Sequence, residues 1–272
     1  MNPMPEVRTS PEEDLQLLRA CAVTAGIIAA GYFRRNVKTW TKEAGGPVSE
    51  ADVVLDEHLH DQLLAARPDY GWLSEETADS TDRLSRDRVF VVDPIDGTRG
   101  FISGEDSWCV SLAVVEQGVP IAGVVYAPAR DEMYEASSDG GARLNGTTIE
   151  LRSPTSRTKP LIPAPGAVHH ALQESGLDYT RGPYYPSLAY RLLQVATGKL
   201  DAAVARRGSH DWDVAGAAIV LAESGVPFED VCAGPVRFNM ADVRHGALAA
   251  IAAPSLRTVL HEALIKVYGC AA

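Results

Sequence analysis

One short segment, residues 89–103, constrains the fold and chemistry of this chain more than any other. A run of Val and Phe residues near its start ends in two aspartates, Asp93 and Asp96, and Gly97 and Thr98 follow directly. A buried strand that ends in carboxylates and continues into a glycine turn can hold hard cations beside backbone N–H groups that bind phosphate. The segment therefore predicts a strand with a metal and phosphate site at its end.

The N-terminal part of the sequence predicts two helices. Ser10, Pro11 and Glu13 form a helix start, with a capping serine, a proline at the first helical position and a glutamate three residues after the cap. Apolar residues at helical spacing then continue to about Arg35. A second helix is expected over residues 51–66.

The middle of the chain predicts a mainly antiparallel sheet. Strands are expected over residues 70–74, 89–92, 108–116, 120–127 and 132–136. Short turns join consecutive strands as hairpins. A stretch rich in Ser, Thr, Pro and Arg, residues 150–165, then marks a boundary. We expect one part over residues 1–152, with the helix pair, the large sheet and most metal ligands, and a second part over residues 153–272.

Helices and strands alternate beyond this boundary. We expect helices over residues 166–176, 187–198, 213–224 and 254–267, and strands near residues 178–181, 201–205, 226–230 and 247–252. Such alternation is typical of a layered α/β arrangement. Together the two parts predict an α+β or α/β protein.

Three acidic clusters stand apart in the sequence: Glu75–Glu76, Asp93 with Asp96, and Asp213 at the start of an apolar helix. Taken singly, the first could be a solvated loop and the last a helix-cap acid. Several carboxylates that converge on one site are costly unless cations neutralise them. Ligands that are all oxygen favour Mg²⁺, Mn²⁺ or Ca²⁺ over zinc.

Thr98 is a candidate for proton transfer. A hydroxyl beside a metal-bound water can accept the proton of that water if a carboxylate takes the proton of the hydroxyl in turn. Asp52 is the leading candidate for that carboxylate, because it lies in a turn, Pro47–Asp52, at the start of a helix. As a lone residue it could also be a helix-cap acid.

Charge and cysteine content narrow the partners and the compartment. The formal net charge of −11 disfavours a nucleic-acid polymer or an anionic membrane as partner. The least polar run, residues 20–33, is too short and too rich in Ala and Gly to span a bilayer. The cysteines show neither zinc-ligand spacing nor a disulfide pattern, and they are Cys21, Cys109, Cys232 and Cys270. We expect a soluble cytoplasmic protein with reduced thiols.

Two stretches resemble the signatures of the inositol monophosphatase family. Residues 93–98, Asp-Pro-Ile-Asp-Gly-Thr, resemble the first, and residues 212–217 with residues 223–225 resemble the second. Ser74–Glu76 and Pro47–Asp52 also fall where this family places motifs. The second signature departs from the family at its end, where Val226 replaces a common glycine. The resemblance covers nearly the whole chain, about residues 10 to 260.

The resemblance implies the layered αβαβα sandwich of the inositol monophosphatase and fructose-1,6-bisphosphatase type, usually as a homodimer. It also implies a Mg²⁺-dependent phosphomonoesterase. Glu75, Asp93 and the carbonyl of Ile95 would hold one ion, and Asp93, Asp96 and Asp213 a second. A third, weaker ion would lie near Glu75, which counts among the catalytic residues. Mn²⁺ could replace Mg²⁺, whereas Ca²⁺ and Li⁺ are expected to inhibit.

The same resemblance implies a mechanism. The phosphate would lie on the N–H groups of Gly97 and Thr98. Water on the first ion, deprotonated through Thr98 and Asp52, would attack phosphorus in line. A haloacid-dehalogenase-type phosphatase is a rival, but its second aspartate follows two residues after the first, not three. A catalytically silent binding or regulatory protein with the same fold is the alternative from another class.

The substrate is a small phosphate monoester whose identity stays open between two classes. Residues 123–128 and 96–102 are closer in wording to bacterial 3'(2'),5'-bisphosphate nucleotidases than to inositol phosphatases. Arg206 and Arg207 stand where inositol phosphatases usually have an acidic residue, and arginine could pair with a second phosphate. They could equally be a solvent-exposed pair. Ser187 is a third candidate for substrate contact. A bisphosphate nucleotide is favoured over inositol monophosphate or another sugar or polyol phosphate.

Overall fold

The first helix, α1 (Pro11–Tyr32), begins at the predicted cap and ends short of Arg35. The computed structural model describes residues 9–42, 45–150 and 157–270. The Ser10 hydroxyl accepts a hydrogen bond from the N–H of Glu13 at 3.2 Å, and the Glu13 carboxylate accepts one from the Ser10 N–H at 2.7 Å. This reciprocal capping box satisfies N–H groups that a helix start leaves without a partner.

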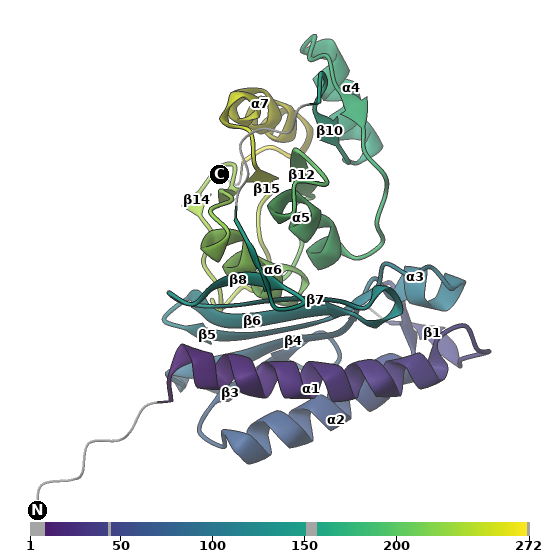
Figure 1. Cartoon of the computed structure of the whole chain (residues 1–272), viewed down its shortest axis with the longest axis vertical. Helices are drawn as coiled ribbons and strands as arrows, with labels where there is room; N and C mark the ends of the chain where they lie inside the picture. Colours follow the sequence, from purple (N-terminus) through teal and green to yellow (C-terminus); the bar gives the residue numbers. More distant parts are fainter. Residues whose placement is uncertain (1–8, 43–44, 151–156, 271–272) are drawn as a thin grey trace, which may run out of the picture.

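By length and composition, α1 is apolar enough to cross a membrane, although the sequence predicts its least polar run to be too short. The environment of the helix decides between these readings. Its apolar stripe is buried in a core shared with the large sheet and α2 (Glu50–Ala66), and consists of Leu15, Leu18, Cys21, Ala22, Ala25 and Ala29. Figure 1 shows α1 lying along the sheet. We therefore assign α1 to the protein core.

Within the described residues, seven strands form the large sheet, in the order β3-β4-β5-β6-β7-β8-β9. Their bounds are β3 (Gly71–Ser74), β4 (Arg88–Asp96), β5 (Cys109–Glu116), β6 (Val119–Ala127), β7 (Glu132–Ser137), β8 (Gly141–Leu144) and β9 (Thr147–Ile149). Neighbouring strands are antiparallel except β3 and β4, which are parallel. The predicted mainly antiparallel sheet is confirmed, and β4 extends beyond Val92 to Asp96.

The hairpin of β8 and β9 is missing from the prediction, although its turn carries a sequence signal. Asn145 and Gly146 have positive φ angles of 49° and 76°. An Asn-Gly pair between two strands is a strong short-range sign of a tight hairpin. The flanking strands are too short to stand out by alternation alone.

The remaining residues build the second half of the molecule. Its helices are α4 (Gly166–Glu174), α5 (Leu188–Ala196), α6 (Asp211–Glu223) and α7 (Arg257–Tyr268). A smaller antiparallel sheet has the order β12-β15-β13-β14, with β12 (Ala202–Ala205), β13 (Phe228–Asp230), β14 (Gly234–Pro235) and β15 (Leu248–Ile251). The predicted alternation is confirmed, although α6 begins at Asp211 and not at Asp213.

Shorter elements connect these layers. They are the antiparallel pair β1 (Thr39–Thr41) and β2 (Pro47–Ser49), the parallel pair β10 (Leu161–Ile162) and β11 (Thr180–Arg181), the helix α3 (Thr98–Ser103), and the 3₁₀ turns η1 (Thr81–Ser85), η2 (Pro128–Arg130) and η3 (Pro254–Leu256).

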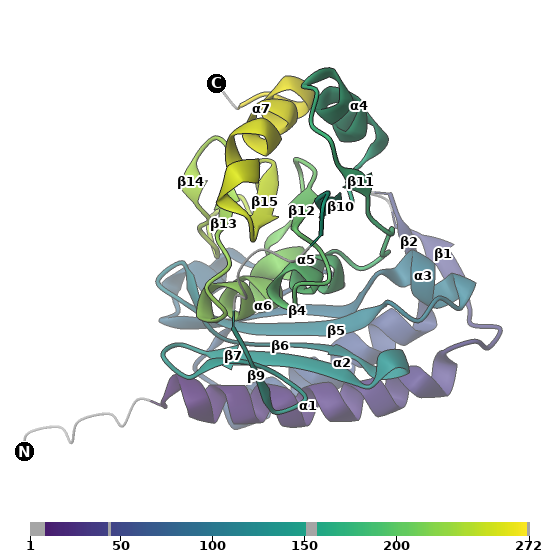
Figure 2. The same cartoon turned by 45° about the horizontal axis from the view of Figure 1, so that its top comes forward.

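The layers follow one another as α, β, α, β, α, which confirms the predicted sandwich. In Figure 1, α1 and α2 cover one face of the large sheet, and α5 and α6 cover the other. The small sheet lies beyond α5 and α6, and α4 and α7 close the stack, as Figure 2 also shows. The predicted boundary between residues 1–152 and 153–272 falls within residues 151–156, outside the described residues.

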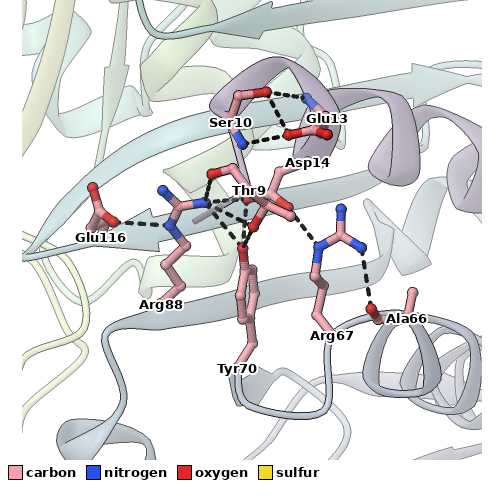
Figure 3. A network of polar contacts seen from close by, with 9 residues as sticks. All are labelled: Thr9, Ser10, Glu13, Asp14, Ala66, Arg67, Tyr70, Arg88 and Glu116. Atoms are coloured by element: carbon pink, nitrogen blue, oxygen red, sulfur yellow. Dashed lines mark hydrogen bonds and ion pairs between the residues drawn. The ribbon is translucent and has the colours of Figure 1, made fainter. Parts of the chain in front are cut away.

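A buried polar network fixes the start of α1 to the sheet (Figure 3). Asp14 is fully buried, and its carboxylate accepts hydrogen bonds from Arg88 at 2.8 Å, Tyr70 at 2.9 Å and Arg67 at 3.1 Å. Arg88 also donates to Glu116 at 2.9 Å. Because Arg88 begins β4 and Asp96 ends it, this network lies at the opposite end of the strand from the predicted metal site.

The expectation of four reduced thiols is wrong for two of them. Cys232 and Cys270 form a disulfide, whereas Cys21 and Cys109 are free and buried. The bond joins the segment between β13 and β14 to the residues that follow α7. The two cysteines are 38 residues apart in the sequence, so their spacing does not indicate a disulfide. They come together only when α7 folds back onto the small sheet.

Candidate active site

The two aspartates at the end of β4 are presented by an irregularity in the sheet. Asp93 pairs with Ser111 of β5 and Asp96 with Cys109, with a register shift between them. Such a bulge bends a strand and redirects its side chains. The Asp93 carboxylate accepts a hydrogen bond from the N–H of Ile95 at 3.1 Å. Both aspartates are buried, at 1% and 6% exposure.

A short helix replaces the predicted turn after Asp96. Gly97 has a φ of 92° and caps α3, which begins at Thr98. A Cβ at position 97 would lie 2.9 Å from the backbone nitrogen of Ser187. Both the left-handed conformation and this close approach require glycine. The first turn of such a helix leaves N–H groups without partners inside the helix, and they can bind an anion.

Thr98 and Asp52 are in direct contact, although they come from different elements. The Thr98 hydroxyl lies 3.0 Å from Asp52 Oδ1, to which it can donate, and 3.0 Å from the carbonyl oxygen of Ile95. Asp52 is buried in the first turn of α2, where its Oδ2 accepts from the Ser49 N–H at 2.8 Å. The capping box of α2 therefore fixes the carboxylate that faces Thr98.

Glu75 and Asp213 reach the same region from two further elements. Glu75 follows β3, and its N–H donates to the carbonyl of Val92 in β4 at 3.2 Å. Asp213 lies in the first turn of α6, and its Oδ2 accepts from the N–H of His210 at 2.6 Å. The structure thus brings the predicted acids of all three clusters to one end of the large sheet.

The pKa values of these acids reflect their crowding. Burial raises the pKa of Asp93 well above its ordinary value of 3.8, and the charges of Glu75 and Asp96 raise it further. Burial and the charge of Asp213 raise the pKa of Asp96 to about 7. Burial also raises the pKa of Glu75, while Lys42 opposes this effect. Carboxyls that disfavour one another's ionisation are stabilised by a shared cation.

The donor set fits a hard divalent cation by its chemistry. It consists of oxygen atoms, which Mg²⁺ and Mn²⁺ prefer. Among the described residues, however, no three acidic, His or Cys side chains are already arranged around a single point as metal ligands. The ammonium of Lys42 lies 2.8 Å from Glu75 and 2.7 Å from Glu76 and balances part of the charge. Lys42 belongs to no motif, so nothing in the sequence singles it out.

Ser187 lies beneath Asp96 and not on an open substrate wall. Its side chain is fully buried, and its hydroxyl donates to Asp96 Oδ2 at 2.6 Å. The N–H groups of Ala189 and Leu188 donate to the same carboxylate at 2.7 Å and 3.2 Å. Its burial and this hydrogen bond indicate contact with Asp96, while the predicted contact with substrate stays a prediction.

Arg206 and Arg207 are exposed on the segment between β12 and α6. Burial raises the pKa of the Tyr268 phenol, and the positive charge of Arg206 partly opposes this effect, so this arginine lies toward the end of α7. A further arginine lies closer to the acids. Arg191 of α5 donates to the carbonyl of Tyr185 at 3.0 Å. Burial lowers the pKa of Arg191, and the nearby charge of Asp96 partly opposes this effect. In the sequence, nothing about Arg191 within the apolar helix α5 indicates a role in the site.

The chain is similar to known proteins over most of its length. The model of the inositol monophosphatase family matches residues 10–268. The chain is 31% identical over 209 residues to an inositol-1-monophosphatase of Mesorhizobium japonicum, with 74% of this chain and 78% of the relative covered. It is 29% identical over 267 residues to the Nus factor SuhB of Haemophilus influenzae, with 93% and 94% covered.

A solved structure shares the fold as well. The extragenic suppressor protein suhB of Bartonella henselae superimposes with a TM-score of 0.80 and 25% identity, with 93% of this chain and 98% of that chain covered.

Proposed function

The chain belongs to the inositol monophosphatase family and is a phosphoric monoester hydrolase, and from this premise we propose that it cleaves a small phosphate monoester with Mg²⁺. The observation that carries the proposal is the contact of 3.0 Å between the Thr98 hydroxyl and Asp52, next to the buried aspartates of β4. A hydroxyl held by a buried carboxylate can relay a proton from an attacking water.

We propose that two or three ions bind to the carboxylates of the site and to a backbone carbonyl. The ligands would be Glu75, Asp93, Asp96, Asp213 and the carbonyl oxygen of Ile95. Bound divalent ions supply Lewis-acid stabilisation of the phosphoryl group and lower the pKa of water. Mn²⁺ would substitute for Mg²⁺, and Ca²⁺ and Li⁺ would inhibit.

The residues of the chain then have separate roles in this proposal. Asp52 Oδ1 accepts the proton of the Thr98 hydroxyl, and the Thr98 oxygen in turn accepts the proton of the attacking water. The N–H groups of Gly97 and Thr98, at the start of α3, orient the phosphate. The Ile95 carbonyl lies 3.0 Å from the same hydroxyl, which supports a ligand and a proton relay side by side.

Phosphatase assays of the purified protein test the reaction class. We expect turnover of inositol 1-phosphate that depends on Mg²⁺ and is lost with EDTA. Asp93→Asn and Asp213→Asn should each lower kcat by at least about 100-fold without loss of fold by circular dichroism, since each removes a charged ligand. Unchanged turnover in either variant would show that the metal mechanism is wrong.

A binding or regulatory role without catalysis is the second candidate. The relative named a Nus factor in H. influenzae, similar over 93% of this chain, supports keeping it. This candidate predicts that the wild-type chain binds Mg²⁺ but turns over no phosphate monoester.

The substrate is the least constrained part of the proposal. A bisphosphate nucleotide would need Arg206 or Arg207, which are exposed, to pair with its second phosphate; the wording of residues 123–128 and 96–102 supports this substrate. The Mesorhizobium relative named inositol-1-monophosphatase supports inositol monophosphate instead. We keep the nucleotide as the favoured substrate. The deciding measurement compares kcat/KM for adenosine 3',5'-bisphosphate, inositol 1-phosphate, fructose 1,6-bisphosphate and histidinol phosphate, with Mg²⁺ and with added Li⁺.

We further propose a homodimer, which light scattering of the purified chain would test. A cytoplasmic location also remains a proposal. The disulfide between Cys232 and Cys270 counts against a strongly reducing compartment.

A further inference from the structure

A buried arginine outside the candidate site joins two segments that are 156 residues apart in the sequence. Arg83 of η1 has an exposure of 2%. Its guanidinium donates to both carboxylate oxygens of Asp79, at 2.7 Å and 2.9 Å. It also donates to Asn239 Oδ1 at 2.6 Å and to the carbonyl oxygen of Met240 at 3.0 Å. A buried guanidinium is tolerated only when its donors are matched in this way.

Arg83 lies against the strand that leads to Glu75. A Cβ at Gly71, the first residue of β3, would lie 3.1 Å from Arg83 Cα, so η1 packs directly on this strand. Asp79, the partner of Arg83 in a bidentate pair, lies shortly after Glu75 and Glu76 on the same connection. The arginine therefore fixes the segment that carries one of the proposed metal ligands.

The contacts continue from Asn239 to the start of α6. The N–H of Asn239 donates to Asp211 Oδ2 at 2.6 Å. Asp211 is 1% exposed, and its other oxygen lies 2.8 Å from His245 Nε2. Asp211 is the first residue of α6, and Asp213 follows in the same turn. Arg83, Asn239 and Asp211 thus form a continuous chain of hydrogen bonds that is buried at Arg83 and Asp211 and half-buried at Asn239.

We propose that Arg83 is a positioning residue for the metal site. It holds the start of α6, which carries Asp213, against β3, the strand that ends before Glu75. The proposal rests on the proposed function, because it takes Glu75 and Asp213 as metal ligands. Groups that hydrogen-bond to metal ligands change the metal affinity when they are lost. Arg83 would act one step further away, through Asp79 on the segment of Glu75 and through Asn239 and Asp211 on the turn of Asp213.

Direct metal binding is the test. Full-length protein freed of metal with EDTA is titrated with MnCl₂ in a calorimeter, as wild type, Arg83→Lys and Asn239→Gly. Lysine at position 83 keeps the positive charge but cannot make the bidentate hydrogen bonds of the guanidinium. Glycine at position 239 removes the Oδ1 acceptor and tolerates the φ of 53° of Asn239. We expect the Kd for Mn²⁺ to rise on the order of tenfold in both variants, with kcat at saturating metal close to that of wild type.

Arg88→Lys is the matched control. Arg88 is also buried and ion-paired, and its neighbour Val89 pairs with Gly71, but its partners are Asp14 and Glu116 and not the segments that carry Glu75 and Asp213. The control variant should lower the melting temperature without changing the Kd for Mn²⁺. Wild-type affinity in Asn239→Gly, or an equal loss in Arg88→Lys, would overturn the positioning role. If wild-type protein neither binds Mn²⁺ nor turns over substrate, the proposed function itself fails, so the two failures can be told apart.

Discussion

The hydroxyl of Ser187 donates a hydrogen bond of 2.6 Å to Asp96 Oδ2, so the start of α5 holds an acid that belongs to β4. The N–H of Ala189 donates to the same oxygen at 2.7 Å. The other oxygen, Asp96 Oδ1, accepts only a longer hydrogen bond of 3.2 Å from the N–H of Leu188. It is therefore better placed than Oδ2 to bind a metal ion. The candidate site is therefore a joint product of the large sheet and the helix layer above it.

Ser187→Ala should weaken both the fold and metal binding. The variant loses a hydrogen bond to a buried carboxylate and the cap of α5, since Ser187 also accepts from the Tyr190 N–H at 2.9 Å. We expect a loss of about 1 to 3 kcal/mol in the free energy of unfolding, measured with urea, and a higher Mg²⁺ requirement. Ser10→Ala removes the cap of α1 far from Asp96 and should lower stability alone. An unchanged Mg²⁺ requirement in Ser187→Ala would contradict the positioning of Asp96.

The metal-free protein should lose stability as pH rises. The pKa of Asp96 is raised from 3.8 to about 7 and that of Glu76 from 4.5 to about 7, mainly by burial. Between pH 4 and 7 the folded state therefore holds protons that the unfolded state has released, so the free energy of unfolding falls through this window and stays low above it. With EDTA, the melting temperature should be higher at pH 5.5 than at pH 8.

Added Mg²⁺ should reverse this trend, because the ion binds the deprotonated carboxylates. Asp96→Asn should flatten the profile of the metal-free protein. A melting temperature in EDTA that rises from pH 5.5 to pH 8 would contradict the raised pKa values.

Thr98→Ala should reduce kcat about 100- to 10,000-fold, the range typical for loss of a general acid–base step, with little change in KM. The reason is that Asp52 would then face no hydroxyl through which to accept the proton of the water. Thr98→Ser keeps the hydroxyl and serves as the control, with kcat within about tenfold of wild type. Steady-state kinetics at saturating Mg²⁺ provide the measurement, and a Thr98→Ala enzyme as fast as Thr98→Ser would exclude the relay.

The fold was predictable where its signals are local. The cap at Ser10 fixed the start of α1, and the run of Val and Phe residues before Asp93 identified β4. The helix α3 was not predictable, because the left-handed Gly97 that begins it is packed against the backbone of Ser187. That neighbour comes from the other part of the chain, so no local propensity indicates it.

The candidate site divides in the same way. Asp93, Asp96 and Thr98 share one short motif, and their grouping follows from chain geometry alone. The contacts of Arg83 with Asn239 and of Lys42 with Glu75 depend on the packing of distant segments. In the sequence, Arg83 and Lys42 cannot be distinguished from ordinary surface charges, because only the folded structure reveals their partners.

Loss of the disulfide should lower stability without lowering activity. Cys270→Ser, or reduction of the wild type, frees the end of α7 from Cys232 and should cost about 2 to 4 kcal/mol in the free energy of unfolding. The site lies at the large sheet, so kcat should not change. Unfolding in guanidinium with and without a reductant gives the difference, and Cys21→Ala is the control because that thiol is free. Identical unfolding curves would contradict the bond.

The arginines between β12 and α6 should separate the two substrate classes. If a second phosphate pairs with Arg206 or Arg207, the double variant to alanine loses charge-assisted hydrogen bonds, each worth about 1.5 to 3 kcal/mol. We then expect kcat/KM for adenosine 3',5'-bisphosphate to fall by at least about tenfold, while kcat/KM for inositol 1-phosphate changes little because it has no second phosphate. Arg19→Ala removes an exposed arginine on α1 and should change neither value. If neither value changes, the pair is a solvated surface feature; an equal fall for both substrates would show that the pair does not read a second phosphate. Either result would count against the nucleotide.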